Sequence, residues 1–449
     1  MTKLKIKIPE QFIEFEVEAE TDGPVIVTPP DPAPSTGFKV GVNYFPWTPM
    51  SLLKSIGMQW ARVYCSSGWI WRPGGIAVQP MYRAETQEAH GLDEMLTKAK
   101  ANGVNVLLCI HQTAEFFRPT GRDDGANDFA PVKAGANRSD PASYRDYAAL
   151  MFQLAARYGR VKHPDSILRV DTTPRWSGDI LNEKRTGLDL LNHLEVWNEP
   201  DKFWLKGTDA YFTPEETAAM MSACCDGHEG ALGAGVGIIT ADPSMQVVMP
   251  ALTDFNRPYF DAMTAWFTAN RKDKKWPCAI LSLHHYSNRG NKSGQIPAQW
   301  VDQGACLPKD DAAFNDVKYF VDFAKSIGKR LWISECGADS KPPSMMYAKG
   351  VGKSDDQFQA DIIVETVKAY KALDVDAVFV FTGPDDYGSA DGGQFETCGL
   401  WTNETTGYKP KVAAIAVKDY IASLLPKKSA AFAAQSYSRK AGPFKRPLK

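Results

Sequence analysis

The sequence lacks the patterns that mark several large protein classes. No stretch approaches the roughly 18 consecutive apolar residues of a membrane-spanning helix. The first residues lead into alternating charge, without the apolar core of a signal peptide. A formal net charge of −2 over 449 residues gives no electrostatic reason to bind a polyanion. We therefore expect neither a membrane nor a nucleic acid as partner. We also expect a cytoplasmic or assembly-associated location, with export only by a non-classical route.

The eight cysteines also lack the spacing of a metal site or of a disulfide framework. Cys224 and Cys225 are adjacent. Four others lie in or beside apolar runs, which indicates buried or surface thiols: Cys65, Cys109, Cys278 and Cys336. The sequence has no HExxH zinc motif, and no GxGxxG phosphate loop follows the first predicted strand. Neither a metal nor an organic cofactor is predicted.

What is present is the composition of an ordinary globular protein, 44% hydrophobic and 23% charged. In residues 1–22 apolar and charged positions alternate, which predicts a β-hairpin arm with lysines of one block opposite glutamates of the other. A frayed terminus is the alternative. The prolines of 23–37 predict a stiff linker, and the basic, acid-free segment 426–449 predicts a solvated tail. An oligomer or larger assembly held through these arms stays open.

The central residues, 38–425, alternate short strand-like runs with helical patterns. Eight strands are predicted, at 39–44, 60–64, 104–110, 194–196, 245–252, 280–286, 330–334 and 377–381. Helices are predicted between them, one of which begins at the capping box of Thr213 and Glu216. This alternation predicts an α/β fold, a closed (β/α)8 TIM barrel with long loop insertions. A doubly wound open sheet is the fallback.

Two glutamates mark the predicted chemistry. Glu199, in Trp197-Asn198-Glu199-Pro200, and Glu335 each end a strand-like run that breaks into Pro, Gly and Asp. In a parallel barrel the carboxyl ends of the strands meet at one face, so these carboxylates can face each other. Acetal hydrolysis needs one protonated and one ionised carboxyl group. The pair therefore predicts a glycosidase, whereas the alternative is a helix-capping Glu199 and a lysine-paired Glu335.

The chain resembles the clan A glycoside hydrolases, which are retaining glycosidases with catalytic glutamates on strands four and seven. The matching residues are Asn198-Glu199-Pro200 on the fourth predicted strand and Glu335 on the seventh, and the resemblance covers roughly residues 38–424. It implies that Glu199 is the general acid/base and Glu335 the nucleophile. It also implies a poly- or oligosaccharide substrate with β-glycosidic bonds.

Neighbouring residues extend the resemblance. Arg62 resembles the clan's arginine that holds the nucleophile ionised. The run His284-His285-Tyr286 resembles its His-x-Tyr motif, which implies that Tyr286 donates a hydrogen bond to Glu335 and that His284 lines the site. His285 should point outward by strand alternation. Two further residues are expected to contact the sugar: His111 and Asn198.

Aromatic residues in the strand-to-helix loops predict sugar platforms, with packing of the insertions as the alternative. The candidates are Trp69, Trp71 and Trp204. The tryptophan that the clan often places on the eighth strand is absent, and Phe381 or Trp401 would replace it. Two rival hypotheses are a non-catalytic carbohydrate-binding barrel and a structural or virion-associated assembly protein with a glycan-binding or depolymerising barrel.

Overall fold

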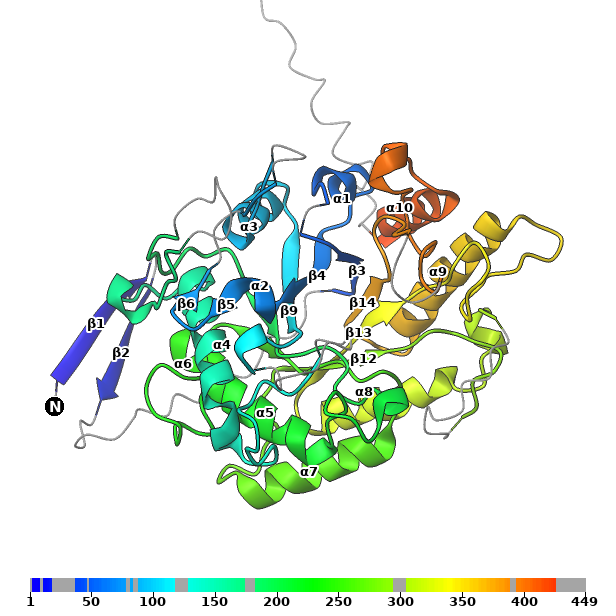
Figure 1. Cartoon of the computed structure of the whole chain (residues 1–449). Helices are drawn as coiled ribbons and strands as arrows, with labels where there is room; N and C mark the ends of the chain where they lie inside the picture. The colour runs from blue at the N-terminus through cyan, green and yellow to red at the C-terminus, as the bar shows by residue number, and fades with distance from the viewer. Residues whose placement is uncertain are drawn as a thin grey trace, which may run out of the picture.

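Eight parallel strands form a closed barrel at the centre of the molecule (Figure 1). The computed structural model describes residues 2–8, 11–17, 37–46, 48–77, 81–83, 88–117, 128–173, 182–293, 304–387 and 393–424. The barrel strands pair in chain order, and the last pairs with the first: β3, β4, β9, β10, β11, β12, β13 and β14. Helices surround the barrel, as Figure 1 shows. The predicted TIM-barrel fold is confirmed.

Each barrel strand lies where the sequence predicts one. Their bounds are β3 (Lys39–Tyr44), β4 (Trp60–Ser66), β9 (Asn105–His111), β10 (His193–Glu195), β11 (Gln246–Val248), β12 (Ile280–His284), β13 (Arg330–Cys336) and β14 (Ala377–Val380). Strand β11 is shorter than predicted because regular pairing stops after Val248. Beyond it only isolated bridges remain, from Ala251 to Asn198 and from Leu252 to Leu283. The chain thus leaves the barrel wall early, next to the predicted site.

Some helical segments begin at side-chain caps. Thr213 and Glu216 form the expected capping box, and Asp140 accepts a hydrogen bond from the Ala142 N–H at the 3₁₀ turn before α4. The described helices are α1 (Ser51–Ser55), α2 (Ser67–Ile70), α3 (Leu92–Ala101), α4 (Arg145–Tyr158), α5 (Pro214–Asp226), α6 (Ile238–Ala241), α7 (Arg257–Asn270), α8 (Val317–Ser326), α9 (Asp355–Ala372) and α10 (Val412–Leu424). None of these described helices is long and apolar enough to cross a membrane.

Three short antiparallel pairs lie outside the barrel. Strands β1 (Thr2–Ile8) and β2 (Gln11–Val17) form the predicted hairpin, with Lys3 opposite Glu16 and Lys5 opposite Glu14 in register. The other pairs are β5 (Trp71–Arg72) with β6 (Gly75–Ile76), and β7 (Met81–Arg83) with β8 (Glu88–His90). The predicted tail, and the predicted linker up to residue 36, fall outside the described residues.

Aromatic rings fill the barrel near the beginnings of its strands. His193 stacks on Trp332 with ring centroids 5.2 Å apart, and the Trp60 ring meets His193 edge-on at 5.1 Å. Phe379 packs against Trp332. A Cβ at position 41 would meet the Phe379 ring at 2.5 Å, so only glycine fits there. This layer, which we call the barrel floor, closes one end of the barrel and leaves the other end for polar groups.

Candidate active site

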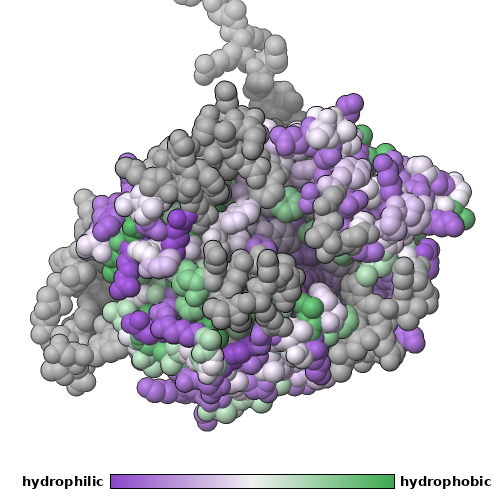
Figure 2. All heavy atoms as spheres, in the orientation of Figure 1, coloured by the Kyte–Doolittle hydropathy of each residue, from purple (hydrophilic) through white to green (hydrophobic). Residues whose placement is uncertain are grey.

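A cleft of about 940 Å³ lies at the carboxyl ends of the barrel strands. The face of the molecule in Figure 2 is hollowed near its middle. The cleft is lined by residues from the loops that follow nearly all the barrel strands. Among the residues that the sequence predicts for the site, eight line it: Trp69, His111, Asn198, Glu199, Trp204, Tyr286, Glu335 and Phe381. The barrel therefore brings together residues that are far apart in the chain.

Glu335, near the end of β13, is held by three donors. Its Oε1 accepts a hydrogen bond from Arg62 Nη1 at 2.7 Å and another from the Tyr64 hydroxyl. Its Oε2 accepts from the Tyr286 hydroxyl at 2.8 Å. The side chain is only 7% exposed. Since one donor is a cation and all three point at the carboxylate, the negative charge of Glu335 is well matched.

Arg62 is fully buried between two carboxylates. Its Nε and Nη2 donate to Glu195 at 2.6 and 3.1 Å, while Nη1 reaches Glu335. Burial opposes the charge on Arg62, but Glu195 and the other groups around it raise the pKa of Arg62 well above its usual value. Burial also raises the pKa of Glu195, against the attraction of Arg62. Glu195 is thus the buried partner that holds Arg62 in position to contact Glu335.

Glu199 follows β10 and faces Glu335 across the cleft. Its backbone has a positive φ of 48°, a conformation that is uncommon for a residue other than glycine and recurs at functional sites. The Glu199 N–H donates to the Ala251 carbonyl at 3.0 Å. Burial raises the pKa of Glu199, while the positive charges of Lys202 and Arg62 lower it. A carboxyl group with a raised pKa is suited to carry a proton at neutral pH.

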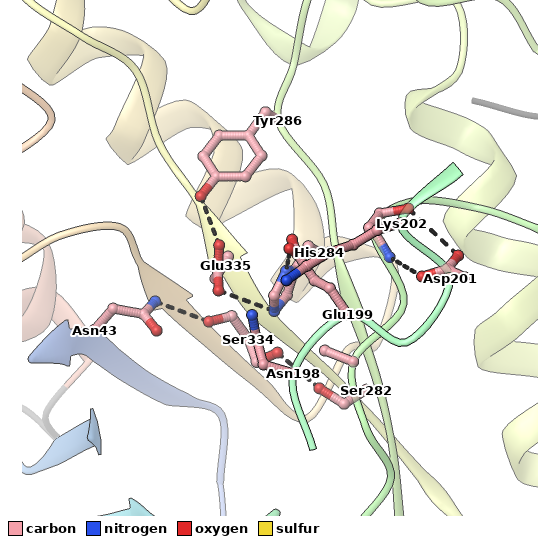
Figure 3. A network of polar contacts seen from close by, with 12 residues as sticks. Asn43, Asn198, Glu199, Asp201, Lys202, Ser282, His284, Tyr286, Ser334 and Glu335 are labelled. Atoms are coloured by element: carbon pink, nitrogen blue, oxygen red, sulfur yellow. Dashed lines mark hydrogen bonds and ion pairs between the residues drawn. The ribbon is translucent and has the colours of Figure 1, made fainter. Parts of the chain in front are cut away.

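His284 lies between the two glutamates, and the side chains converge in Figure 3. Its Nδ1 is 2.7 Å from Glu199 Oε1 in a hydrogen bond. Its Nε2 is 3.1 Å from Glu335 Oε1, but the two are not aligned as a hydrogen bond. Burial lowers the pKa of His284 to about 3, so the ring is neutral. It therefore contacts both carboxyl groups without adding a charge.

The same three side chains have ligand atoms within 4.8 Å of one another, which is close enough to surround a cation. They are Glu199, His284 and Glu335. Two of these atoms already have partners. Glu335 Oε1 accepts from Arg62 and Tyr64, and Glu199 Oε1 is bonded to His284. Because the guanidinium of Arg62 already supplies a positive charge at this point, a metal ion would meet repulsion there.

The remaining polar candidates lie beside this pair. Asn198 accepts a hydrogen bond from Arg62 Nη2 at 2.7 Å through its Oδ1. His111 ends β9 and packs edge-on against Tyr64 with ring centroids 5.6 Å apart. Burial lowers the pKa of His111 to about 4, so this ring is neutral as well. Both residues line the cleft and can offer hydrogen bonds to a bound sugar.

The predicted aromatic platforms divide into two groups. Trp69 and Trp204 line the cleft and are 40% and 55% exposed. Trp71 instead packs against Phe116, Phe117 and Tyr147. Trp401 is buried, 1% exposed, and pairs with the chain on both sides through bridges to Pro384 and Pro410. Among the described residues Phe381, and not Trp401, therefore takes the position in the cleft after the eighth strand.

Several functional candidates were not predicted. Tyr64 follows Arg62 by two residues on β4, so both point to the same side, and this spacing was the available signal. Lys202 lines the cleft beside Glu199 and forms an ion pair with Asp128. Asp128 lies in the loop that follows β9. Glu195 lies within a run that appears apolar, Leu194-Glu195-Val196. Its isolated charge in a buried strand was the clue.

The comparisons with known proteins give likeness of fold. No family profile matches the sequence, and no curated protein matches it. A family 39 glycoside hydrolase from Bacteroides cellulosilyticus WH2 superposes with a TM-score of 0.52 at 13% identity, covering 85% of this chain and 63% of that one. A glucosidase from Croceicoccus marinus gives 0.50 at 13% identity, covering 86% and 66%. An exo-β-1,4-mannosidase from Opitutaceae bacterium strain TAV5 gives 0.51 at 15% identity, covering 88% and 60%.

These structures share the barrel of glycoside hydrolases with this chain, in agreement with the resemblance to clan A. The chain spans less than two thirds of the length of each of the three. At such low identity the likeness extends to the fold alone, because one fold hosts many activities. The chemistry has to be argued from the side chains of the cleft.

Proposed function

We propose that this chain is a retaining glycoside hydrolase that cleaves β-glycosidic bonds of a poly- or oligosaccharide by double displacement. The observation that carries the proposal is the spacing of the two carboxyl groups. An oxygen of Glu199 lies within 4.8 Å of an oxygen of Glu335. Retaining enzymes hold these groups about 5–5.5 Å apart, whereas inverting enzymes leave about 6.5–9.5 Å for a water molecule. The short spacing supports retention, and the β configuration rests on the clan A resemblance.

In the first step the carboxylate of Glu335 attacks the anomeric carbon, and the bond from that carbon to the leaving oxygen breaks. Glu199 gives its proton to the leaving oxygen. The contacts of each residue suit its role. Glu335 is matched by Arg62, Tyr64 and Tyr286 as an anion, while burial raises the pKa of Glu199. A glycosyl ester on Glu335 results.

In the second step water attacks the anomeric carbon and the ester bond to Glu335 breaks. Glu199, now ionised, takes the proton from that water. The change of role has an electrostatic cause. Once Glu335 is an ester it no longer carries a negative charge, so the pKa of the nearby Glu199 falls and the carboxylate becomes the favoured form. Release of the sugar restores the charge on Glu335 and the proton on Glu199.

The size and lining of the cleft favour more than one sugar unit. Its volume of about 940 Å³ is near the upper end of the 300–1,000 Å³ that is usual for ligand sites. Asn198 and His111 lie beside the catalytic pair, while Trp69 and Trp204 present partly exposed rings. Aromatic faces bind the C–H faces of sugars, and polar side chains bind the hydroxyl groups. This combination supports an oligosaccharide or polysaccharide as substrate.

The proposal is tested by measuring reducing ends released from a panel of β-linked polysaccharides and aryl β-glycosides. Activity that disappears in Glu335→Gln would support the assignment, and activity that survives would overturn it. The configuration of the first-formed product, followed by proton NMR, distinguishes retention from inversion. In Glu199→Ala an added azide ion should restore turnover and give a β-glycosyl azide, because azide attacks the glycosyl ester without needing a general base.

A further inference from the structure

His285 is the neighbour of His284 in the chain but lies on the opposite side of the β12 end, as strand alternation predicts. It is completely buried. Its Nδ1 is 3.2 Å from Asp254 Oδ1, and its Nε2 is 2.9 Å from Asp311 Oδ2. An imidazolium ion donates from both ring nitrogens, whereas a neutral imidazole donates from only one. Two acid side chains, one at each nitrogen, therefore favour an imidazolium ion at this position.

The surroundings hold this ion in place. The imidazole ring stacks on Phe255 with centroids 4.3 Å apart, and Phe314 and Tyr370 meet it edge-on. The charged groups that face it are the two aspartates, one from the loop before α7 and one from the loop before α8. Burial disfavours its charge, but Asp311 and Asp254 raise the pKa of His285 to about 9. The charge therefore persists at neutral pH.

Short contacts connect this ion to both catalytic glutamates. The His285 N–H donates to the Glu335 carbonyl at 3.0 Å. Three residues before Asp254, the Ala251 carbonyl accepts from the Glu199 N–H at 3.0 Å. The Leu252 carbonyl accepts from the His284 N–H at 2.8 Å. The backbone of His285 is thus tied to Glu335, and the backbone of His284 is tied to the loop whose Ala251 carbonyl holds Glu199.

Asp311 extends the connection to Tyr286. The amide Nδ2 of Asn291 donates to Asp311 Oδ2 and to the Tyr286 carbonyl, both at 3.1 Å. Strand pairing between β12 and β13 is irregular between Leu283 and His284. The backbone at this point is consequently not fixed by a regular ladder. His284 and Tyr286 flank His285 in the chain, so the side-chain contacts of His285 act on the backbone that carries both residues.

We propose that His285, clamped as a cation between Asp254 and Asp311, is a positioning residue that fixes His284 and Tyr286 against the catalytic glutamates. It touches no substrate, so its effect acts through the contacts from His284 to Glu199 and from Tyr286 to Glu335. The kinetic consequences of the His285 contacts rest on the proposed glycosidase function. The charge of His285 and its influence on Glu199 do not rest on that function, because both can be observed without turnover.

The kinetic test compares His285→Gln with the wild type. Glutamine removes the charge and cannot donate to both aspartates, so the β12 end loses its anchor. We expect kcat to fall about 10- to 100-fold, the scale of a misplacement of about 1 Å, with KM changed less than about 3-fold. The alkaline limb of the pH–rate profile should also move, because the contact between His284 and Glu199 changes.

Asp93→Asn serves as the control. It weakens a buried ion pair between α3 and α4, in which Arg157 donates to Asp93 at 2.6 and 2.9 Å. Like His285→Gln it should lower the melting temperature, but it should leave kcat per folded molecule and the pH profile unchanged. If His285→Gln folds and behaves like Asp93→Asn, the proposal is overturned. If His285→Gln does not fold, Asp254→Asn replaces it, since Asp254 is partly exposed.

The second test uses NMR and needs no substrate. In ¹⁵N-histidine-labelled protein at about pH 7, His285 should have two protonated ring nitrogens and His284 one. A ¹³C titration should find the pKa of the Glu199 carboxyl changed in His285→Gln. A neutral His285, or an unchanged Glu199 titration in the folded variant, would overturn the clamp. Both NMR signatures in a protein inactive on every glycoside would support the clamp and instead overturn the proposed function.

Discussion

The barrel floor and the cleft at the opposite end of the barrel each contain a neutral histidine. Burial lowers the pKa of both His193 and His284 to about 3. Their surroundings differ. His193 packs between the rings of Trp60 and Trp332, whereas His284 lies between the carboxyl groups of Glu199 and Glu335. A shifted pKa alone therefore does not distinguish a catalytic site from a packed one.

The carboxylates of the two ends differ in the same way. At the floor, Asp376 accepts from Lys39 at 3.1 Å and from Trp332 Nε1 at 2.7 Å, and it does not line the cleft. In the cleft, Glu335 has comparable partners but also lines open space next to a second carboxyl group. What identifies the site is the convergence of two acids on a space that a substrate can enter.

The largest effect should come from Glu335→Gln. Glutamine keeps the shape of the side chain but cannot attack the anomeric carbon. We expect kcat to fall about 10⁴-fold or more, as when one member of a catalytic set is removed. Steady-state kinetics on the best substrate of the panel measure this loss, and circular dichroism checks that the variant is folded. Activity within about 10-fold of the wild type would contradict the central role of Glu335.

Asp376→Asn makes the matched change at the barrel floor. It removes a charge that partners Lys39 and receives the Trp332 indole N–H. We expect the free energy of unfolding to fall by about 1–3 kcal/mol, the cost of weakening charged hydrogen bonds. Activity per folded molecule should not change. Urea unfolding and kinetics measured on the same sample separate the two effects. A large loss of kcat would contradict a purely structural role for the carboxylate at the barrel floor.

Substitutions of the exposed tryptophan in the cleft and of the buried tryptophan should have different effects, one on KM and the other on stability. Trp204→Ala removes a ring that is 55% exposed in the cleft, so KM should rise about 3- to 10-fold, which corresponds to one aromatic contact. Trp401→Ala removes a ring that is 1% exposed, and the free energy of unfolding should fall by about 3–5 kcal/mol. KM values and denaturation curves check both. A destabilised Trp204→Ala with normal KM would reverse the assignment.

A substitution of Lys202 tests the role of Glu199 through the direction in which the pH profile moves, and its expected effect is smaller. The positive charge of Lys202 lowers the pKa of Glu199, in opposition to burial. Lys202→Met should therefore raise that pKa further and move the alkaline limb of the kcat/KM profile to higher pH, since the acid keeps its proton longer. Lys206→Met, at an exposed position nearby, is the control. A limb that moves to lower pH would show that Glu199 is not the titrating acid.

His285 should also affect stability, in a way that depends on pH. Its pKa is raised to about 9 in the folded protein, compared with about 6.5 in an unfolded chain. The stabilisation is therefore complete below about pH 6.5 and is lost as the pH rises through about 9. Of the groups that face it besides Asp254, the positive charge of His285 lowers the pKa of Asp311 against the effect of burial, and Tyr370 stays neutral in this range because burial raises its pKa. Melting temperatures should fall with rising pH in the wild type and less in His285→Gln.

The sequence predicts the barrel well because each strand is a short apolar run with its own turn signals. Glu199 and Glu335 can be predicted because each follows a short apolar run that then breaks into Pro, Gly and Asp. Residues that act through tertiary contacts are harder. The isolated charge of Glu195 is visible in the sequence, but its partner Arg62 is recognisable only once β4 and β10 are placed on either side of β9. The packing of Trp71 and Trp401 depends in the same way on chain segments distant in sequence.

Trapping the glycosyl ester tests the central claim most directly. An activated 2-deoxy-2-fluoro glycoside of the preferred sugar should react once and accumulate, because the fluorine slows the second step more than the activated leaving group slows the first. Mass spectrometry of the intact protein and of its peptides then locates the sugar. We predict one sugar per chain, bound to Glu335 and absent from Glu335→Gln. A sugar bound to another residue, or steady turnover with inversion and no adduct, would contradict the account.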